Sequence, residues 1–386
     1  MSDPIYLDHN GTTPIDTEVL DAMLPFLREE FGNASSTTPW GRRARGAVEQ
    51  ARAEVASLIN AQPDEIVFTS GGTESSNHAI RGFADRARND QRRIITTAVE
   101  HPATENACRR LESSGFEVLR IPVSRNGLID AEAAASTLGV STALVTVIHA
   151  QNETGVLQPV AALAHAATEA GVPIHVDASQ SVGKVPIDVA AWGIDAMTIA
   201  GHKLYAPKGI GALFLKHTRN LPSLLAGAGQ ERGQRPGTEN VPYIVGLGRA
   251  CTIAARRLAE DANGIAQLRD ALWHELAGKV PGLIRVGSGA PMLPNTLNVL
   301  FPGVAGNALL AATPTVAAST GSACHAGEDR PSSIILAHGY TPAEAVGAVR
   351  LTLGRTTTAK DIAHAAAALA ETWEQLTLRA HRAATL

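Results

Sequence analysis

Short apolar runs that end abruptly at small or polar residues recur through the first half of the chain. Runs of this length are typical of strands that are buried in a parallel sheet. They predict strands at residues 65–69, 93–98, 116–121, 143–149, 173–177, 195–200 and 211–215. Helical spacing of apolar positions predicts helices at 17–30, 41–59, 74–87, 102–113, 130–137 and 158–170. This alternation of strands and helices is the pattern of an α/β domain with a mostly parallel sheet.

The pattern changes after a helical stretch at 243–262. From about residue 263 the predicted order is helix, strand, strand, a glycine- and serine-containing loop, strand and a long final helix. We interpret this region as a smaller α+β domain against which the N-terminal arm packs. A chain of 386 residues is also long for a single core. The predicted division is therefore a large domain at 15–255 and a small domain made of 1–14 and 256–386.

Two neighbouring predicted strands are followed by a carboxylate and an amine. Asp177 ends the run at 173–177, and Lys203 follows the run at 195–200. Ligands of parallel sheets bind beyond the carboxyl ends of the strands, so both side chains are expected to face one crevice. This pair suits pyridoxal phosphate, because a lysine amine can hold the cofactor aldehyde and a carboxylate can keep its pyridine nitrogen protonated. An ordinary ion pair at the strand ends is the alternative.

A glycine-rich turn offers a place for the phosphate of such a cofactor. Gly71, Gly72 and Thr73 follow the strand at 65–69 and open the helix at 74–87. Free N–H groups, a hydroxyl and the positive end of the helix dipole favour an anion there. The same residues are also compatible with a simple strand-to-helix turn. The glycines at 227–233 do not have dinucleotide-loop spacing and are not framed by a βαβ unit, which argues against a Rossmann domain.

Composition excludes several other classes of protein. The chain is 45% hydrophobic and 18% charged, which is typical of a compact soluble protein. A net charge of −4 without a dense basic cluster argues against binding to nucleic acid. No apolar run approaches membrane-spanning length, and the first residues do not resemble a signal peptide. Three widely spaced cysteines form neither a disulfide framework nor a zinc site, so we expect a reducing cytoplasm and no metal.

Ordered motifs along essentially the whole chain resemble those of cysteine desulfurases, which are class V, fold-type I pyridoxal phosphate enzymes. The motifs are YLDHNGTTP at 6–14, FGNASS at 31–36, TSGGTE at 69–74, VEH at 99–101, NETG at 152–155, GHK at 201–203, GQER at 229–232, RPGT at 235–238, GSACH at 321–325 and VRLTLGR at 349–355. The resemblance implies the α/β fold-type I architecture, with a mostly parallel sheet in the large domain.

The same resemblance implies roles for individual residues. Lys203 and His101 are expected to move protons, and Asn152 and Arg350 to bind the substrate. A surface salt bridge is the alternative for Arg350, as a helix-start role is for His101. The residues expected to hold the cofactor are Gly72, Thr73, His101, Asn152, Asp177, Gln180, Ala200, Gly201, His202, Lys203 and Thr238. Thr238 is expected to reach the phosphate of a second subunit, which implies a homodimer with shared sites.

Cys324 is the expected nucleophile that accepts sulfur from L-cysteine and becomes a persulfide. It lies in a loop rich in small residues, and the neighbouring His325 favours its thiolate. Cys108 and Cys251 lie instead in helical patterns, where a cysteine is usually a small buried hydrophobe. The resemblance implies that the persulfide passes to an acceptor protein such as an iron–sulfur scaffold or a tRNA-thiolation protein.

The sequence is also compatible with other activities of the family. The sequence from Cys324 to Ser332 also resembles that of selenocysteine lyases, which act on L-selenocysteine. Ala200 occupies a position where many cysteine desulfurases have serine. The resemblance implies that selenocysteine lyases also lack this serine, so the change slightly favours a lyase. Thr38 replaces a common histidine and has no interpretation from the sequence. A class V aminotransferase would give Cys324 no role, and a non-catalytic sulfur-relay protein would have lost Lys203.

Overall fold

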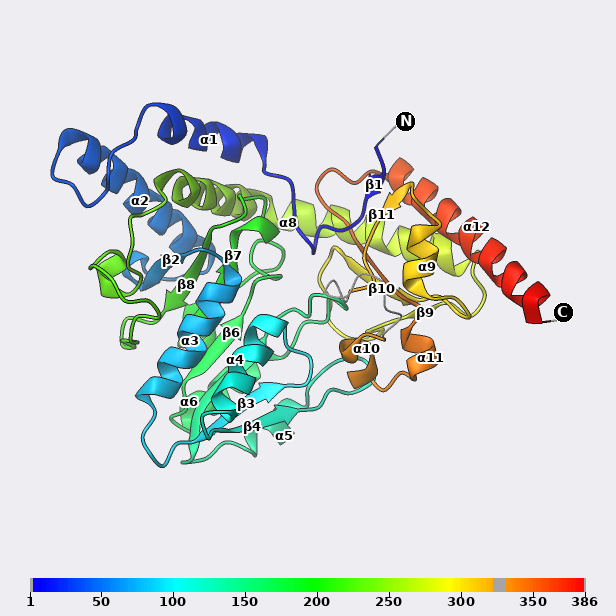
Figure 1. Cartoon of the computed structure of the whole chain (residues 1–386), viewed down its shortest axis with the longest axis horizontal. Coiled ribbons are helices and arrows are strands. Elements are labelled where there is room, and N and C mark those ends of the chain that lie inside the picture. Colours follow the sequence, from blue (N-terminus) through cyan, green and yellow to red (C-terminus); the bar gives the residue numbers. More distant parts are fainter. Residues whose placement is uncertain (1–2, 322–330, 385–386) are drawn as a thin grey trace.

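The computed structural model describes residues 3–321 and 331–384. The chain forms a large seven-stranded sheet, a small three-stranded sheet and a separate pair of short strands, and a single long helix runs past the large and the small sheet (Figure 1). The large and the small sheet each pack against their own hydrophobic core. The predicted nucleophile Cys324 and its neighbour His325 lie outside the described residues.

The large sheet contains all seven strands that the sequence predicts for the first part of the chain. They are β2 (Ile66–Thr69), β3 (Arg93–Thr97), β4 (Glu117–Ile121), β5 (Thr142–Ile148), β6 (Ile174–Asp177), β7 (Ala196–Ala200) and β8 (Gly211–Leu215). Their order across the sheet is β2-β8-β7-β6-β5-β3-β4. β8 runs antiparallel to both of its neighbours, β2 and β7, and every other pair of adjacent strands is parallel. The predicted mostly parallel α/β sheet is thus confirmed.

Helices cover both faces of the large sheet. One face packs against α3 (Gly72–Arg86) and α4 (Pro102–Glu112), and the other packs against α2 (Pro39–Leu58) and α6 (Val160–Glu169). Strand residues alternate between the two cores, so Val67 faces α3 while its neighbours Ile66 and Phe68 face α2. The remaining elements of this region are α1 (Thr17–Arg28), η1 (Pro63–Glu65), α5 (Ala131–Ala135), α7 (Val189–Trp192), η2 (Gly201–Lys203) and η3 (Glu231–Gly233).

Thr38, which had no interpretation from the sequence, begins α2. Its hydroxyl oxygen accepts a hydrogen bond from the backbone N–H of Gly41 at 3.2 Å. Proline follows at the first helical position, where its missing N–H costs nothing. Threonine at this position is therefore a helix cap.

The small sheet is antiparallel and has the order β12-β10-β9. Its strands are β9 (Ile284–Arg285), β10 (Thr296–Leu300) and β12 (Ala348–Thr352). The N-terminal arm joins this region as predicted, because β1 (Ile5–Tyr6) pairs with β11 (Val316–Ala317) and Leu7 lies in the same core. The helices here are α9 (Gly306–Ala311), α10 (Ser333–Ala337), α11 (Pro342–Ala345) and α12 (Ala359–Ala384).

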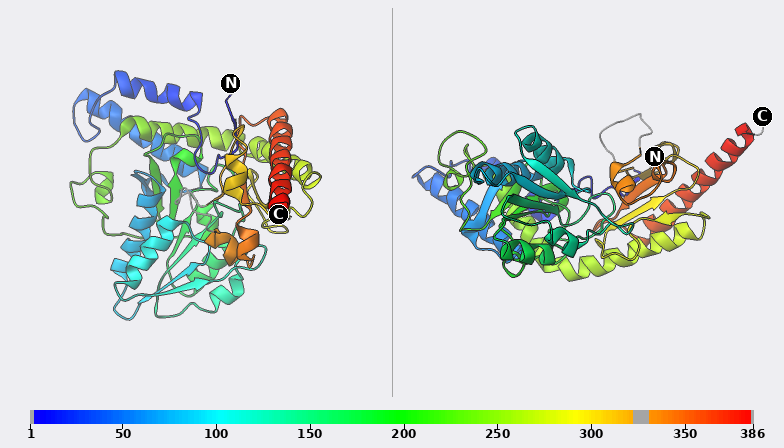
Figure 2. Two further views of the ribbon diagram at one scale, coloured as in Figure 1. Left: turned by 45° about the vertical axis from the view of Figure 1, so that its right-hand side comes forward. Right: turned by 90° about the horizontal axis from the view of Figure 1, so that it is seen from below.

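A single helix, α8 (Val241–Ala277), connects the two regions. The sequence predicts a helix at 243–262 and then a separate one, but the structure has one continuous helix of 37 residues. Figure 2 shows it running from the large sheet to the small sheet, where it lies beside α12. Residues up to Ile253 pack in the core of the large sheet, and Leu272 and Leu276 pack in the core of the small sheet. The predicted division after residue 255 therefore falls inside a helix.

No helix between residues 3 and 384, leaving aside the undescribed stretch at 322–330, combines the length and the apolar character needed to cross a bilayer.

Candidate active site

Asp177 and Lys203 lie at the carboxyl ends of the adjacent strands β6 and β7. Asp177 is the last residue of β6 and is buried, and its Oδ1 accepts a hydrogen bond from the N–H of Ser179 at 2.9 Å. Lys203 ends the short turn after β7 and donates from Nζ to the backbone oxygens of Asn10 and Gly11, both at 2.6 Å. The negative charge of Asp177 raises the pKa of Lys203, so the two predicted residues share one polar site.

The surroundings of Lys203 favour a free amine. Desolvation, and after it the nearby cation of Arg350, lower the pKa of Lys203 to about 8, although the carboxylates of Asp8 and Asp177 act in the opposite direction. A lysine must be deprotonated to attack an aldehyde or to accept a proton. At neutral pH this amine is much closer to that state than an ordinary lysine is.

A cavity of about 500 Å³ opens at the N-terminus of α3. Thr73, His202 and Lys208 line it together with glycine backbone. Glu74 also lines it, but Arg235 pairs with this carboxylate at 3.0 Å. Free helix N–H groups, a hydroxyl and an ammonium group form a donor set for a phosphate dianion.

The glycine at the mouth of this cavity is required by close packing. A Cβ on Gly72 would lie 2.9 Å from the Ser179 hydroxyl oxygen and 3.3 Å from the Ala200 Cβ. Ala200 therefore packs directly behind the first turn of α3, where a serine would add a hydroxyl. Together with Asp177 and Lys203, this donor set fits pyridoxal phosphate.

His101 lies beside Asp177 and Lys203. It caps α4, and its Nδ1 accepts a hydrogen bond from the N–H of Ala103 at 3.1 Å. This bond leaves the proton of the neutral ring on Nε2. Desolvation lowers the pKa of His101, Asp177 raises it and Lys203 lowers it. The helix-start role and the proposed role toward the cofactor are thus compatible in one side chain.

Asn152 and Gln180 are joined to the site by the N-terminal segment. The side-chain nitrogen of Asn10 donates to the backbone oxygen of Asn152 at 3.2 Å, and Gln180 Nε2 donates to the backbone oxygen of Asn10 at 3.0 Å. His202 contacts the same segment, with its Nδ1 at 3.2 Å from the Thr12 hydroxyl oxygen. Desolvation and neighbouring lysines lower the pKa of His202 to about 4, so its ring is neutral.

Arg350 reaches the site from β12. Val349, Leu351 and Leu353 face the small core, and Arg350 points to the other side, as the alternation predicts. That side is buried, however, and the arginine is only 5% exposed. Its Nη2 pairs with Asp8 at 2.6 Å and its Nη1 donates to the backbone oxygen of Asn152 at 3.0 Å.

Thr238 lies outside the phosphate cavity of its own chain. It lines a neighbouring cavity with Glu231, Arg235 and Asn240, and the two cavities share Ser70, Gly209 and Ile210. The predicted contact of Thr238 with a second subunit stays a prediction.

The sequence missed three polar residues of the site. Asn10 lies within the motif YLDHNGTTP but was given no role from the sequence, although its backbone oxygen accepts a hydrogen bond from Lys203. Glu100 precedes His101, and burial raises its pKa to about 8, so it is mostly protonated at neutral pH. Lys184 donates to Asn10 Oδ1 at 3.1 Å and to Gln180 Oε1 at 3.0 Å. In the sequence, only the position of Lys184 seven residues after Asp177 could have indicated that it lies near the site.

Comparisons with known proteins agree on one family. The family model "Aminotransferase class-V" matches residues 5–364. A cysteine desulfurase of Homo sapiens is 41% identical over 362 residues, which cover 93% of this chain and 79% of that protein. The solved structure of a NifS-like protein has a TM-score of 0.89 at 33% identity and covers 97% of this chain and 100% of its own. The structure described as SspA in complex with cysteine has a TM-score of 0.81 at 35% identity, covering 90% and 98%.

Proposed function

Because the chain belongs to the class-V aminotransferase family and is a pyridoxal phosphate-dependent cysteine desulfurase, we propose that it passes the sulfur of L-cysteine to Cys324. The observation that supports this function best is the edge formed by the carboxyl ends of β6 and β7, where Asp177 and Lys203 lie within electrostatic reach of each other near the cavity at the N-terminus of α3. The comparisons favour cysteine over selenocysteine as the substrate of the family branch, because the relatives are cysteine desulfurases.

When bound, pyridoxal phosphate supplies an electron sink conjugated to the amino nitrogen of the substrate. The N-terminus of α3, Thr73, His202 and Lys208 would hold its phosphate, and Asp177 would hold its pyridine nitrogen. Gln180 and His101 would contact its ring. Ala200 and Gly201 would shape the wall behind it.

Different residues of the chain bind the substrate and move its protons. Arg350 binds the carboxylate of cysteine, with Asn152 beside it. Lys203, whose pKa is about 8, accepts the α-proton as a free amine. His101 holds a proton on Nε2 and can deliver it inside the site.

The overall sulfur transfer balances without an added oxidant. The thiolate of Cys324 attacks the sulfur of cysteine, the carbon–sulfur bond breaks and a sulfur–sulfur bond forms. A proton replaces sulfur on the carbon, so the products are L-alanine and a Cys324 persulfide. The persulfide then passes to the thiol of an acceptor protein, as in iron–sulfur cluster assembly.

The working form in this proposal is a cytoplasmic homodimer. The exposed Thr238 lies near the rim of the phosphate cavity without lining it, which suits a residue that serves the site of a second subunit. Size-exclusion chromatography with light scattering tests this form, and a monomer with full activity would contradict it.

The direct test of the function compares two substrates in one preparation. Purified protein reconstituted with pyridoxal phosphate is given L-cysteine or L-selenocysteine, and alanine is measured. We expect alanine from cysteine, with one sulfur added to the peptide that contains Cys324. Alanine from selenocysteine alone would replace the proposal with a selenocysteine lyase.

A further inference from the structure

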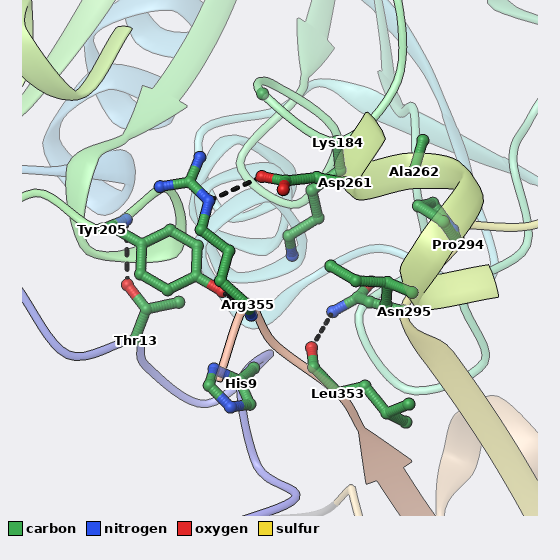
Figure 3. A pocket seen from close by; sticks show the side chains of 12 residues that line it. His9, Thr13, Lys184, Tyr205, Asp261, Ala262, Pro294, Asn295, Leu353 and Arg355 are labelled. Atoms are coloured by element: carbon green, nitrogen blue, oxygen red, sulfur yellow. Dashed lines mark hydrogen bonds and ion pairs between the residues drawn. The ribbon is translucent and has the colours of Figure 1, made fainter. Parts of the chain in front are cut away.

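A second amine, Lys184, lies close to Lys203 but has no part in the proposed chemistry. It lines a cavity between the two regions of the chain, together with Asn295 and residues of α8 such as Asp261 (Figure 3). None of the ion pairs in the described part of the chain involves Lys184. Its partners are two amide oxygens, those of Asn10 and Gln180. Lysine donates three hydrogen bonds and accepts none as an ammonium group, so it fixes which end of each amide faces it.

The contact with Gln180 sets the direction of that side chain. Because Oε1 of Gln180 accepts from Lys184 at 3.0 Å, its Nε2 is turned the other way and donates to the backbone oxygen of Asn10 at 3.0 Å. The other N–H of this amide is not used in either contact and can donate to the cofactor. An amide without a fixed partner at its oxygen can rotate by half a turn and present its oxygen instead.

The contact with Asn10 sets the position of the groups that hold Lys203. The Oδ1 of Asn10 accepts from Lys184 at 3.1 Å and from Asn295 at 3.0 Å. The backbone oxygen of the same residue accepts from Lys203 at 2.6 Å. A shift of Asn10 therefore moves an acceptor of the catalytic amine directly.

The remaining contacts of Asn10 extend the network into the substrate side of the site. Its Nδ2 donates to the backbone oxygen of Asn152 at 3.2 Å and to the hydroxyl of Thr296 at 2.9 Å. Each polar atom of the asparagine side chain thus has two partners. A network in which every member is satisfied is rigid, and loss of one donor loosens the whole set.

The charges around Lys184 favour the same role. Desolvation, together with the cations of Lys203 and Arg350, lowers its pKa to about 7. A neutral amine still donates to both amide oxygens and adds no second positive charge beside Lys203. A donor that is neutral part of the time can therefore hold this network without opposing the chemistry.

We propose that Lys184 is a positioning residue that turns the amide nitrogen of Gln180 toward the cofactor and fixes Asn10 as an acceptor for Lys203. This inference rests on the roles given to Gln180 and Lys203 in the proposed function. The alternative is that Lys184 only fills space between the two regions of the chain. The two possibilities differ in whether the effect of Lys184 passes through Gln180.

A double-mutant cycle separates them. Lys184→Met keeps the length of the side chain and removes its donors, Lys184→Arg keeps donors, and Lys360→Met on the exposed start of α12 is the matched control. Each change is made in the wild-type protein and in Gln180→Ala. The readouts are the visible absorption band of the bound cofactor and the dissociation constant of pyridoxal phosphate from the apoprotein, neither of which needs turnover.

In the wild-type background we expect Lys184→Met to weaken cofactor binding by about tenfold and to shift the absorption band, because it removes two hydrogen bonds from the network around Gln180 and Asn10. Lys184→Arg is expected to restore part of both. In the Gln180→Ala background the same change should have a smaller effect, below about threefold, because only the route through Asn10 remains and coupled residues are not additive. An unchanged band, or an equal effect in both backgrounds, would overturn the proposal. Alanine release by the wild type and by Lys360→Met tests the proposed function separately.

Discussion

Arg350 and Asp8 form an ion pair of 2.6 Å that joins β12 to the N-terminal segment of the active site. The arginine was predicted to capture the carboxylate of the substrate, and a salt bridge was the alternative. The structure shows that a salt bridge is present, but it uses only Nη2, while Nη1 contacts Asn152 and the buried Nε has no partner among the described residues. A substrate carboxylate can therefore bind by using Nε or by replacing Asp8.

This arrangement predicts a selective effect of Arg350→Lys. Lysine keeps the positive charge but loses the planar fork that binds two oxygens at once. We expect the KM for L-cysteine to rise by about tenfold to a hundredfold, as for loss of one hydrogen bond to a charged group, with a smaller change in kcat. Steady-state kinetics check this expectation. A normal KM in this variant would show that another group binds the carboxylate, and Arg285→Lys, remote from the site, is the matched control.

Lys203 is predicted to be the residue that binds the cofactor covalently. Lys203→Ala should leave a protein that binds pyridoxal phosphate only through noncovalent contacts and loses alanine production by about three orders of magnitude or more. Borohydride reduction followed by mass spectrometry locates the attachment in the wild type. Lys208→Ala is the matched control, because Lys208 lines the phosphate cavity and should weaken binding without moving the attachment. Cofactor trapped on Lys208 in the wild type would refute the assignment.

The pKa of Lys203 predicts the pH dependence of cofactor attachment. Only the free amine attacks the aldehyde, so the rate should rise about tenfold per pH unit while the amine is mostly protonated. Because the pKa in the folded protein is lowered to about 8, the rise should level off near that pH. Stopped-flow absorbance after mixing apoprotein with pyridoxal phosphate measures this rate. A rate that keeps rising toward the pKa of an ordinary lysine, about 10.4, would show that the site does not perturb the amine.

The loop that carries Thr238 is fastened by a buried ion pair. Arg52 donates to Glu231 through Nη2 at 2.7 Å and through Nη1 at 2.8 Å, and both side chains are almost fully buried. Arg52→Met leaves the buried carboxylate unpaired, so the free energy of unfolding should fall by about 3–5 kcal/mol. The exposed pair of Arg43 and Glu30 is the control, and its loss should cost about 0–1 kcal/mol. Urea unfolding of both variants checks the difference, and equal losses would contradict it.

The sequence predicted what depends on local patterns and missed what depends on distant contacts. The seven strands of the large sheet were found because each is a short apolar run with a polar end. The continuity of α8 was missed because Asn263 and Gly264 resemble a helix end. Both halves of the helix pack against a hydrophobic core, and this packing keeps the helix continuous. Lys184 and Asn10 are 174 positions apart, and no periodicity can bring them together. The side of β12 that carries Arg350 followed from alternation, but its partner Asp8 did not.

Removal of the Cys324 thiol separates sulfur transfer from simple release of sulfide. Cysteine sulfur needs a thiolate acceptor, whereas selenium is a better leaving group and needs less help. Cys324→Ala should therefore bind cofactor and cysteine normally, lose alanine production from cysteine by orders of magnitude, and keep part of the activity on selenocysteine.

The other two cysteines provide the control for that experiment. Cys108 and Cys251 are both buried, and burial raises the pKa of Cys108 to about 12 and that of Cys251 as well, so neither supplies a thiolate at neutral pH. Cys108→Ala should therefore still form the persulfide. Mass spectrometry after one turnover with cysteine should find the added sulfur on the peptide that contains Cys324. Sulfur on Cys108 or Cys251, or undiminished desulfuration by Cys324→Ala, would remove Cys324 from the mechanism and leave an enzyme that releases free sulfide.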